Sequence, residues 1–408
     1  MGNKSTLAEV RKKSLEAVLP ERTVLPSGMV ILTKKMLSNG FESMVLGTKR
    51  GGSFFGPPEL FHFLEHLLSV PYRTRSYVDD VDAGTTINSV VVAKTTIAQR
   101  KLIKKLRDIA HDINRPAFTA LESERGAIIT ELGERFDDPD LFITNLFLEA
   151  CFPKSNIARS NSEEFSSIRH HLTKSMLLKY ARKFFVPSNL ILAITGDSVL
   201  HSKICDEAQR LFTSDKPAPK FRRPPLGKPT GTVDNPQIVV RPGIKNSYFE
   251  LGMPLRNFPM DQGLAFTLLG NLLENHLNHI LRFRYGLVYG VKFQFVHNYL
   301  FSFWGLSGSC EPKNLRRVVE LVCRELESFS VSEREVDSQK EFSFEMAVNF
   351  CSNPGRCADF MYDLELDGVD YPKTTEVLLR TNADSLRSLW RKHFSVDCVA
   401  MVILRSKP

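Results

Sequence analysis

His62-Phe63-Leu64-Glu65-His66 is the most informative stretch of this 408-residue chain. It lies within residues 59–68, where apolar residues recur at helical spacing, so we expect a helix there. Residues four apart project from one face of a helix, and two imidazoles placed in this way can reach one metal ion. Glu65 lies on the adjoining part of that face, where its carboxylate can accept a proton from a metal-bound water. The pattern predicts a zinc site, because zinc readily accepts histidine nitrogen.

A helix face without any ligand role is the alternative interpretation. The surrounding residues are large and apolar, which predicts that the helix is mostly buried: Phe61, Phe63, Leu64, Leu67 and Leu68. A buried glutamate is costly unless it is paired or linked to a metal. This cost favours the metal-site interpretation of His62, Glu65 and His66.

A catalytic zinc site takes three protein ligands and keeps a position for water. Glu124 and Glu131 are seven residues apart in a segment expected to be helical, so they share one face. Glu131 is the predicted third ligand, and Glu124 is the predicted acid that orients or tunes the site. A solvated acidic helix face is the alternative, because more acids lie close by: Glu122, Glu134, Asp137, Asp138 and Asp140.

With further motifs, the chain resembles the pitrilysin-type metallopeptidases, which carry the inverted His-x-x-Glu-His motif. Within that family it looks most similar to the catalytic (beta) subunit of the mitochondrial processing peptidase and its single-chain bacterial relatives. The resemblance runs from about residue 23 to the end. Besides residues 62–66, it rests on Leu25-Pro26-Ser27-Gly28, Gly84 with Asn88, Glu124 to Glu131, and Phe185-Val186-Pro187-Ser188-Asn189.

The resemblance implies one zinc ion per chain and a zinc-bound water that Glu65 deprotonates for attack on a peptide carbonyl. Leu281-Arg282 followed by Gly286-Leu287-Val288-Tyr289 resembles the family's arginine and tyrosine pair. By similarity, Arg282 and Tyr289 face the zinc from the second domain and contact the substrate.

The implied function is removal of N-terminal targeting presequences from imported precursors. The implied location is the matrix of a mitochondrion or of a mitochondrion-derived organelle, or the cytoplasm if the protein is bacterial. The alternatives are a general oligopeptidase of the bacterial single-chain type and a non-catalytic core subunit of a respiratory or processing complex. A homodimer, or a heterodimer with a family relative, is also implied.

Two departures affect the substrate rather than the chemistry. The processing peptidase has two acids, ten and fourteen residues past the glutamate ligand, that hold a presequence arginine. The matching residues here are Leu141 and Asn145, so recognition of that arginine is in doubt. The loop at residues 71–82 is also shorter than in the processing peptidase.

The expected fold class is α+β, with two similar domains, each a largely antiparallel sheet packed with helices. A proline-rich stretch at 213–231 is the predicted linker. It separates a zinc domain at 23–212, preceded by an extension at 1–22, from a domain at 232–408 that lacks the zinc motif. Both halves end with an amphipathic helix followed by a short apolar strand, which indicates duplication.

The bulk composition excludes other classes of protein. The net charge of +8 is spread along the chain without a basic, aromatic-interleaved stripe, so no nucleic-acid partner is expected. No apolar run is long enough to predict a transmembrane segment. The seven cysteines are scattered without a C-x-x-C pair, which favours reduced thiols. Glu274, His276 and His279 lack further ligands nearby, so a packing or surface role is expected for them.

Overall fold

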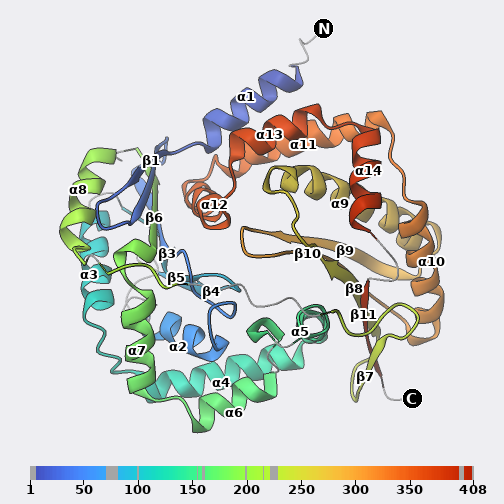
Figure 1. Ribbon diagram of the computed structural model, residues 1–408, viewed down its shortest axis with the longest axis horizontal. Coiled ribbons are helices and arrows are strands. Elements are labelled where there is room, and N and C mark those ends of the chain that lie inside the picture. The colour runs from blue at the N-terminus through green and yellow to red at the C-terminus, as the bar shows by residue number, and fades with distance from the viewer. Residues whose placement is uncertain are drawn as a thin grey trace.

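The protein folds into two α+β halves, which confirms the predicted fold class (Figure 1). The computed structural model describes residues 6–69, 81–98, 101–153, 155–158, 161–197, 200–214, 216–220, 228–394 and 399–406. Residues 71–80 of the loop expected to be short, and residues 221–227 of the expected linker, lie outside this part of the chain.

The first half contains a six-stranded sheet and the second half a five-stranded sheet. In spatial order, the first consists of β1 (Glu21–Val24), β2 (Val30–Lys35), β6 (Leu190–Gly196), β3 (Phe41–Thr48), β5 (Val90–Ala98) and β4 (Asp82–Thr85). The second consists of β7 (Gln237–Arg241), β11 (Ala400–Ser406), β8 (Ser247–Pro254), β10 (Ser302–Cys310) and β9 (Val288–His297). The neighbouring strands are antiparallel except β2 with β6 and β7 with β11.

The two sheets repeat one topology. The order β2-β6-β3-β5-β4 corresponds strand for strand to β7-β11-β8-β10-β9. The last strand along the chain in each half, β6 or β11, inserts next to β2 or β7 and runs parallel to it. The duplication that the two similar C-terminal segments indicate therefore extends to both sheets.

The helices occur in a similar chain order in both halves, except that α8 follows the last strand of the first sheet and has no counterpart among the described residues after β11. The first half contributes α2 (Pro58–Ser69), α3 (Leu102–Asn114), α4 (Leu121–Asp137), α5 (Pro139–Cys151), α6 (Asn161–His170), α7 (Lys174–Phe184) and α8 (His201–Leu211). The second contributes α9 (Gly263–Asn278), α10 (Leu315–Ser328), α11 (Glu333–Phe350), α12 (Pro354–Asp367), α13 (Tyr371–Arg380) and α14 (Ala383–His393). None of the described helices is both long and apolar enough to cross a lipid bilayer.

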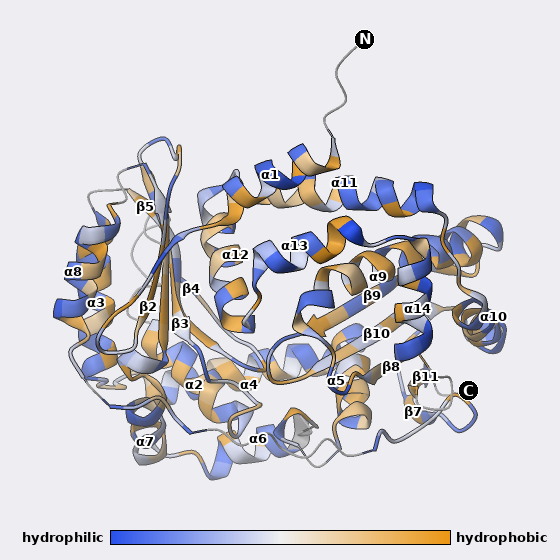
Figure 2. Cartoon of the chain, turned by 45° about the horizontal axis from the view of Figure 1, so that its top comes forward, coloured by the Kyte–Doolittle hydropathy of each residue, from blue (hydrophilic) through white to orange (hydrophobic). Residues whose placement is uncertain are grey.

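In each half, one helix packs against the sheet of the other half. Helix α5 packs on β8 and β11 of the second sheet, and α12 packs on β3 and β6 of the first. Figure 2 shows that α5 is mostly apolar along its length, which suits a helix that packs against the sheet of the other half. Tyr362 of α12 is fully buried and its hydroxyl lies 2.5 Å from that of Ser89. The two halves therefore share buried surface on both sides of the molecule.

The N-terminal helix α1 (Leu7–Val18) belongs spatially to the second half. It packs on α11 and α13 (Figure 1), and Val10 joins the second hydrophobic core. The chain then crosses to the first sheet, where β1 begins at Glu21. Residues 6–24 thus hold the two halves together.

Glu250 on β8 gives a prediction about stability and pH. Its fully buried carboxylate accepts hydrogen bonds from Thr144 of α5 (2.9 Å) and Gln294 of β9 (2.7 Å). Burial raises its pKa to about 7. Between pH 4.5 and 7, Glu250 therefore keeps its proton in the folded protein but loses it in the unfolded chain. The free energy of unfolding falls as the pH rises through this range.

We expect Glu250→Gln to raise the free energy of unfolding by about 1–3 kcal/mol at pH 8, because an amide carries no charge to desolvate. At pH 4 the gain disappears. Thermal unfolding at both pH values measures the difference, with exposed Glu134→Gln as the control. A gain of equal size at both pH values would contradict the prediction.

Candidate metal centre

Helix α2 buries four ionisable side chains, three of which belong to the predicted site. It begins at Pro58, whose fixed φ suits a first helical position, and every residue from Glu59 to Ser69 is buried. His62, Glu65 and His66 are only 4%, 5% and 6% exposed. Polar groups buried to this degree need partners, and α4, which packs against α2, supplies them for the two histidines.

The structure brings His62, His66 and Glu131 together. The Oε2 atom of Glu131 lies 3.2 Å from Nε2 of His62 and 3.3 Å from Nε2 of His66. One ligand atom from each of the three residues lies within 4.8 Å of the others. A tetrahedral zinc ion about 2.0–2.1 Å from each ligand holds neighbouring ligand atoms about 3.3 Å apart. These two separations and the N₂O donor set therefore fit zinc.

Two further carboxylates lie behind the histidines. Glu124 Oε2 accepts a hydrogen bond from Nδ1 of His66 at 2.8 Å, which leaves Nε2 free to face Glu131. Such a carboxylate fixes the tautomer and orientation of a metal-binding histidine. Nδ1 of His62 is buried without a hydrogen-bond partner, and its nearest carboxylate oxygen, Glu164 Oε1, is 4.0 Å away. The two imidazoles hold the pKa of Glu131 well below its usual range.

Glu65 points toward the edge strand of the first sheet. Thr85, at the end of β4, donates a hydrogen bond to Glu65 Oε2 at 3.3 Å. A pocket of about 260 Å³ opens here and is lined by His62, Thr85 and residues from five other segments. These other lining residues are Ser53, Pro58, Thr86, Ile87, Arg135, Asn145, Leu148, Asn156, Ile157 and Glu164.

The positions expected to read the substrate differ in exposure. Leu141 is 48% exposed on α5, whereas Asn145 lines the pocket beside His62. Neither can pair with a cationic side chain as a carboxylate does. Glu164 and Arg135 also line the pocket, and no sequence pattern pointed to either of them.

Arg282 and Tyr289 form an exposed pair outside that pocket. Arg282 lies in the π-helical segment His279–Arg284, and its guanidinium is 4.8 Å from the ring centroid of Tyr289. Tyr289 is 85% exposed. Neither residue lines the pocket beside His62, and their role in closing the site stays a prediction.

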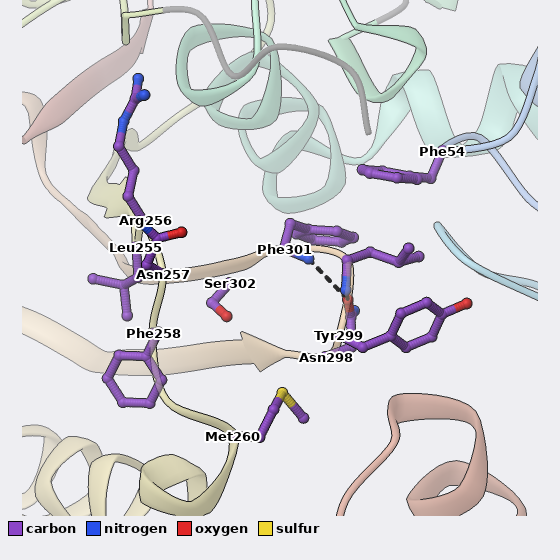
Figure 3. A pocket seen from close by; sticks show the side chains of 11 residues that line it. Phe54, Leu255, Arg256, Asn257, Phe258, Met260, Asn298, Tyr299, Phe301 and Ser302 are labelled. Atoms are coloured by element: carbon purple, nitrogen blue, oxygen red, sulfur yellow. Dashed lines mark hydrogen bonds between the residues drawn. The ribbon is translucent and has the colours of Figure 1, made fainter. Parts of the chain in front are cut away.

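A second cavity of about 400 Å³ lies across the domain boundary (Figure 3). It is lined by Phe54 of the first half and by two segments of the second, residues 255–260 and 298–302. Phe54 stacks on Phe301 with a centroid distance of 5.3 Å. Ser53 lines the pocket beside His62, so the two cavities are neighbours along this segment.

His276 and Glu274, which were also singled out in the sequence, have structural partners. His276 contacts Glu325 at 3.0 Å, and Glu274 accepts a hydrogen bond from the backbone of Phe293 at 2.7 Å. Among the described residues, His62, His66 and Glu131 form the one group of three or more potential ligands close enough to hold a metal.

Gly52 supports the wall of the pocket beside His62. Its φ is +68°, and an added Cβ would lie 1.9 Å from the carbonyl oxygen of Thr86. We expect Gly52→Ala to lower the free energy of unfolding by about 1–3 kcal/mol or more, and to slow any peptidase activity by displacing Thr86. Gly40→Ala is the matched control, because Gly40 has φ +84° but open space around it. Denaturant unfolding and peptide cleavage measure both variants; equal losses would mean that backbone strain alone is responsible.

Comparison with known proteins places these features in context. A family model described as the peptidase M16 inactive domain matches residues 171–342, a range that excludes the three clustered ligands. A Streptomyces coelicolor protein described as an uncharacterized zinc protease is 26% identical over 334 residues, covering 74% of this chain and 70% of the relative. One from Mycobacterium tuberculosis is 27% identical over 298 residues, covering 67% of this chain and 66% of the relative.

Solved structures share the fold over nearly the whole chain. A protease from Helicobacter pylori superimposes with a TM-score of 0.81 at 16% identity, covering 95% of this chain and 100% of that one. An M16-like peptidase from Alicyclobacillus acidocaldarius gives 0.79 at 17% identity, covering 96% and 99%. At these identities the likeness shows the fold alone. A particular closeness to the mitochondrial processing peptidase is not shown.

Proposed function

We propose that the chain is a zinc-dependent endopeptidase of the pitrilysin type (M16), a proposal that the matches to zinc proteases and to the M16 domain model support. His62, His66 and Glu131 hold the metal, and Glu65 is the general base. The observation that carries this proposal is the convergence of two Nε2 atoms on one oxygen of Glu131, at 3.2 and 3.3 Å.

A zinc ion bound there supplies a Lewis acid that polarises the scissile carbonyl and acidifies water. Glu65 accepts the proton of the attacking water and returns it to the leaving amine. Thr85 orients the Glu65 carboxylate by its hydrogen bond. Glu124 keeps His66 in the tautomer whose Nε2 faces the site.

The substrate is proposed to be an extended polypeptide. Strand β4 forms one edge of the first sheet, and Thr85 at its end lines the pocket beside His62. An edge strand offers unpaired backbone groups with which an extended peptide can pair. Arg282 and Tyr289 are proposed to close over the bound peptide, and their mutual stacking preorganises them for that role.

Broad peptide specificity is favoured over presequence processing. Asn145 lines the pocket at a position where the processing enzymes carry an acid, so the pocket lacks that acid's attraction for arginine. Presequence removal in a mitochondrial or related matrix is the narrower version of this proposal. Equal cleavage rates for a basic amphipathic presequence and an unrelated unfolded peptide would support broad specificity, and a strong preference for the presequence would support the narrower version.

A non-catalytic core subunit, alone or paired with a family relative, is the second candidate. The description of the matching domain model as inactive favours it, although that match lies outside residues 62–131. The deciding experiment incubates the purified chain with an unfolded peptide, with and without a zinc chelator, and measures bound metal. Chelator-sensitive cleavage that returns with added zinc supports the enzyme. Absence of both zinc and cleavage overturns the enzyme and leaves the subunit role.

A further inference from the structure

The two carboxylate oxygens of Glu131 have different partners. Oε2 faces the Nε2 atoms of both histidines, whereas Oε1 accepts a hydrogen bond from Nη2 of Arg135. Arg135 lies one helical turn after Glu131 on α4 and reaches back along the helix to make this contact. The arginine thus holds the oxygen that the histidines leave unused.

We propose that Arg135 is a positioning residue that restricts Glu131 to binding zinc through Oε2 alone. This inference rests on the proposed zinc site. A glutamate can bind a metal through one oxygen or both, and a second oxygen would occupy a further position on the ion. A catalytic zinc site needs that position for water. With Oε1 held by Arg135, the position stays open.

The location of Arg135 suits this role. Its side chain is half exposed and lines the same pocket as His62. An exposed ion pair four residues apart on a helix contributes little to stability. The consequence of the contact therefore lies in the geometry of Glu131 rather than in the stability of α4.

The charges around the site also favour an arginine here. Four carboxylates lie in or beside the cluster: Glu65, Glu124, Glu131 and Glu164. A guanidinium on Glu131 offsets part of this negative charge and withdraws electron density from the ligand oxygen. Its planar fork also defines the carboxylate plane better than a lysine ammonium does.

The test compares Arg135→Gln, Arg135→Lys and the control Arg380→Gln in the full chain. Arg380 makes the same kind of i, i+4 pair, with Glu376 of α13, away from the proposed site. Zinc affinity is measured by competition with a chelating dye. The visible absorption of the Co²⁺-substituted protein reports coordination number, since four-coordinate cobalt absorbs more strongly than five-coordinate cobalt.

We expect Arg135→Gln to show weakened Co²⁺ absorption as Oε1 joins the ion, and to bind zinc about 10-fold more tightly, because a positive charge is removed and a second oxygen ligand is added. Arg135→Lys should lie between this variant and the wild type, and Arg380→Gln should match the wild type. Unchanged affinity and an unchanged Co²⁺ spectrum in Arg135→Gln would overturn the inference.

The outcome is separable from that of the proposed function. A wild-type chain that binds zinc but cleaves no peptide would refute the peptidase, while affinity and spectrum would still decide the role of Arg135. A wild-type chain that binds no zinc would overturn both.

Discussion

A Glu65→Gln variant is expected to bind zinc as the wild type does and to cleave peptides about 100- to 10,000-fold more slowly. Glutamine fills nearly the same buried space beside Thr85 but cannot accept a proton from water. The ligands His62, His66 and Glu131 are untouched, so the metal should stay. Bound zinc is measured by elemental analysis, and cleavage is measured under single-turnover conditions.

Glu59→Gln is the matched control for this variant. Glu59 is a buried glutamate on the same helix, 3% exposed, and it accepts a hydrogen bond from Ser167 at 2.6 Å. It lies six residues before Glu65 and does not line the pocket beside His62. Both substitutions remove one buried carboxyl from α2, so a loss of cleavage confined to Glu65→Gln assigns the effect to proton transfer. Full activity of Glu65→Gln would refute the proposed mechanism.

Local spacing was sufficient to predict the parts of the site that lie on single helices. The four-residue interval between His62 and His66 and the seven-residue interval between Glu124 and Glu131 each place two side chains on one face. The helices at these positions depend mainly on apolar periodicity, which can be seen in any short window of sequence. That α2 and α4 pack together was implied by the prediction of Glu131 as the third ligand and by the family resemblance, and not by spacing within either helix.

Contacts between segments that are distant in the sequence could not be predicted from local spacing. Glu164 approaches His62 from α6, a separate helix about a hundred residues later in the chain, and no motif marks it. The exchange of α5 and α12 between the two sheets also depends on long-range packing. The same limit applies to Arg135. Its sequence allows ion pairs with several residues of α4, and the oxygen of Glu131 that it contacts depends on the histidines of the facing helix.

Substitution of Glu131 should have the largest effect on metal binding. We expect Glu131→Gln to weaken zinc binding by more than about 100-fold, beyond the range of about 10–100-fold typical of residues that only orient a ligand. The substitution removes the one anionic ligand and leaves two imidazoles with a neutral amide. Cleavage should fall to background at zinc concentrations that saturate the wild type. Equilibrium dialysis with a zinc buffer measures the affinity.

Three glutamates on α4 make this prediction a graded test. Glu131 contacts both imidazoles, Glu124 contacts only the far nitrogen of His66 at 2.8 Å, and Glu134 is exposed. The same change to glutamine should therefore lower zinc affinity most at Glu131, by about 10-fold at Glu124, and not at all at Glu134. If α4 were merely an acidic helix face that attracts cations, the three losses would be similar, because each variant removes one negative charge. The order of the losses thus separates a built metal site from a charged surface, independently of any assay of peptide cleavage.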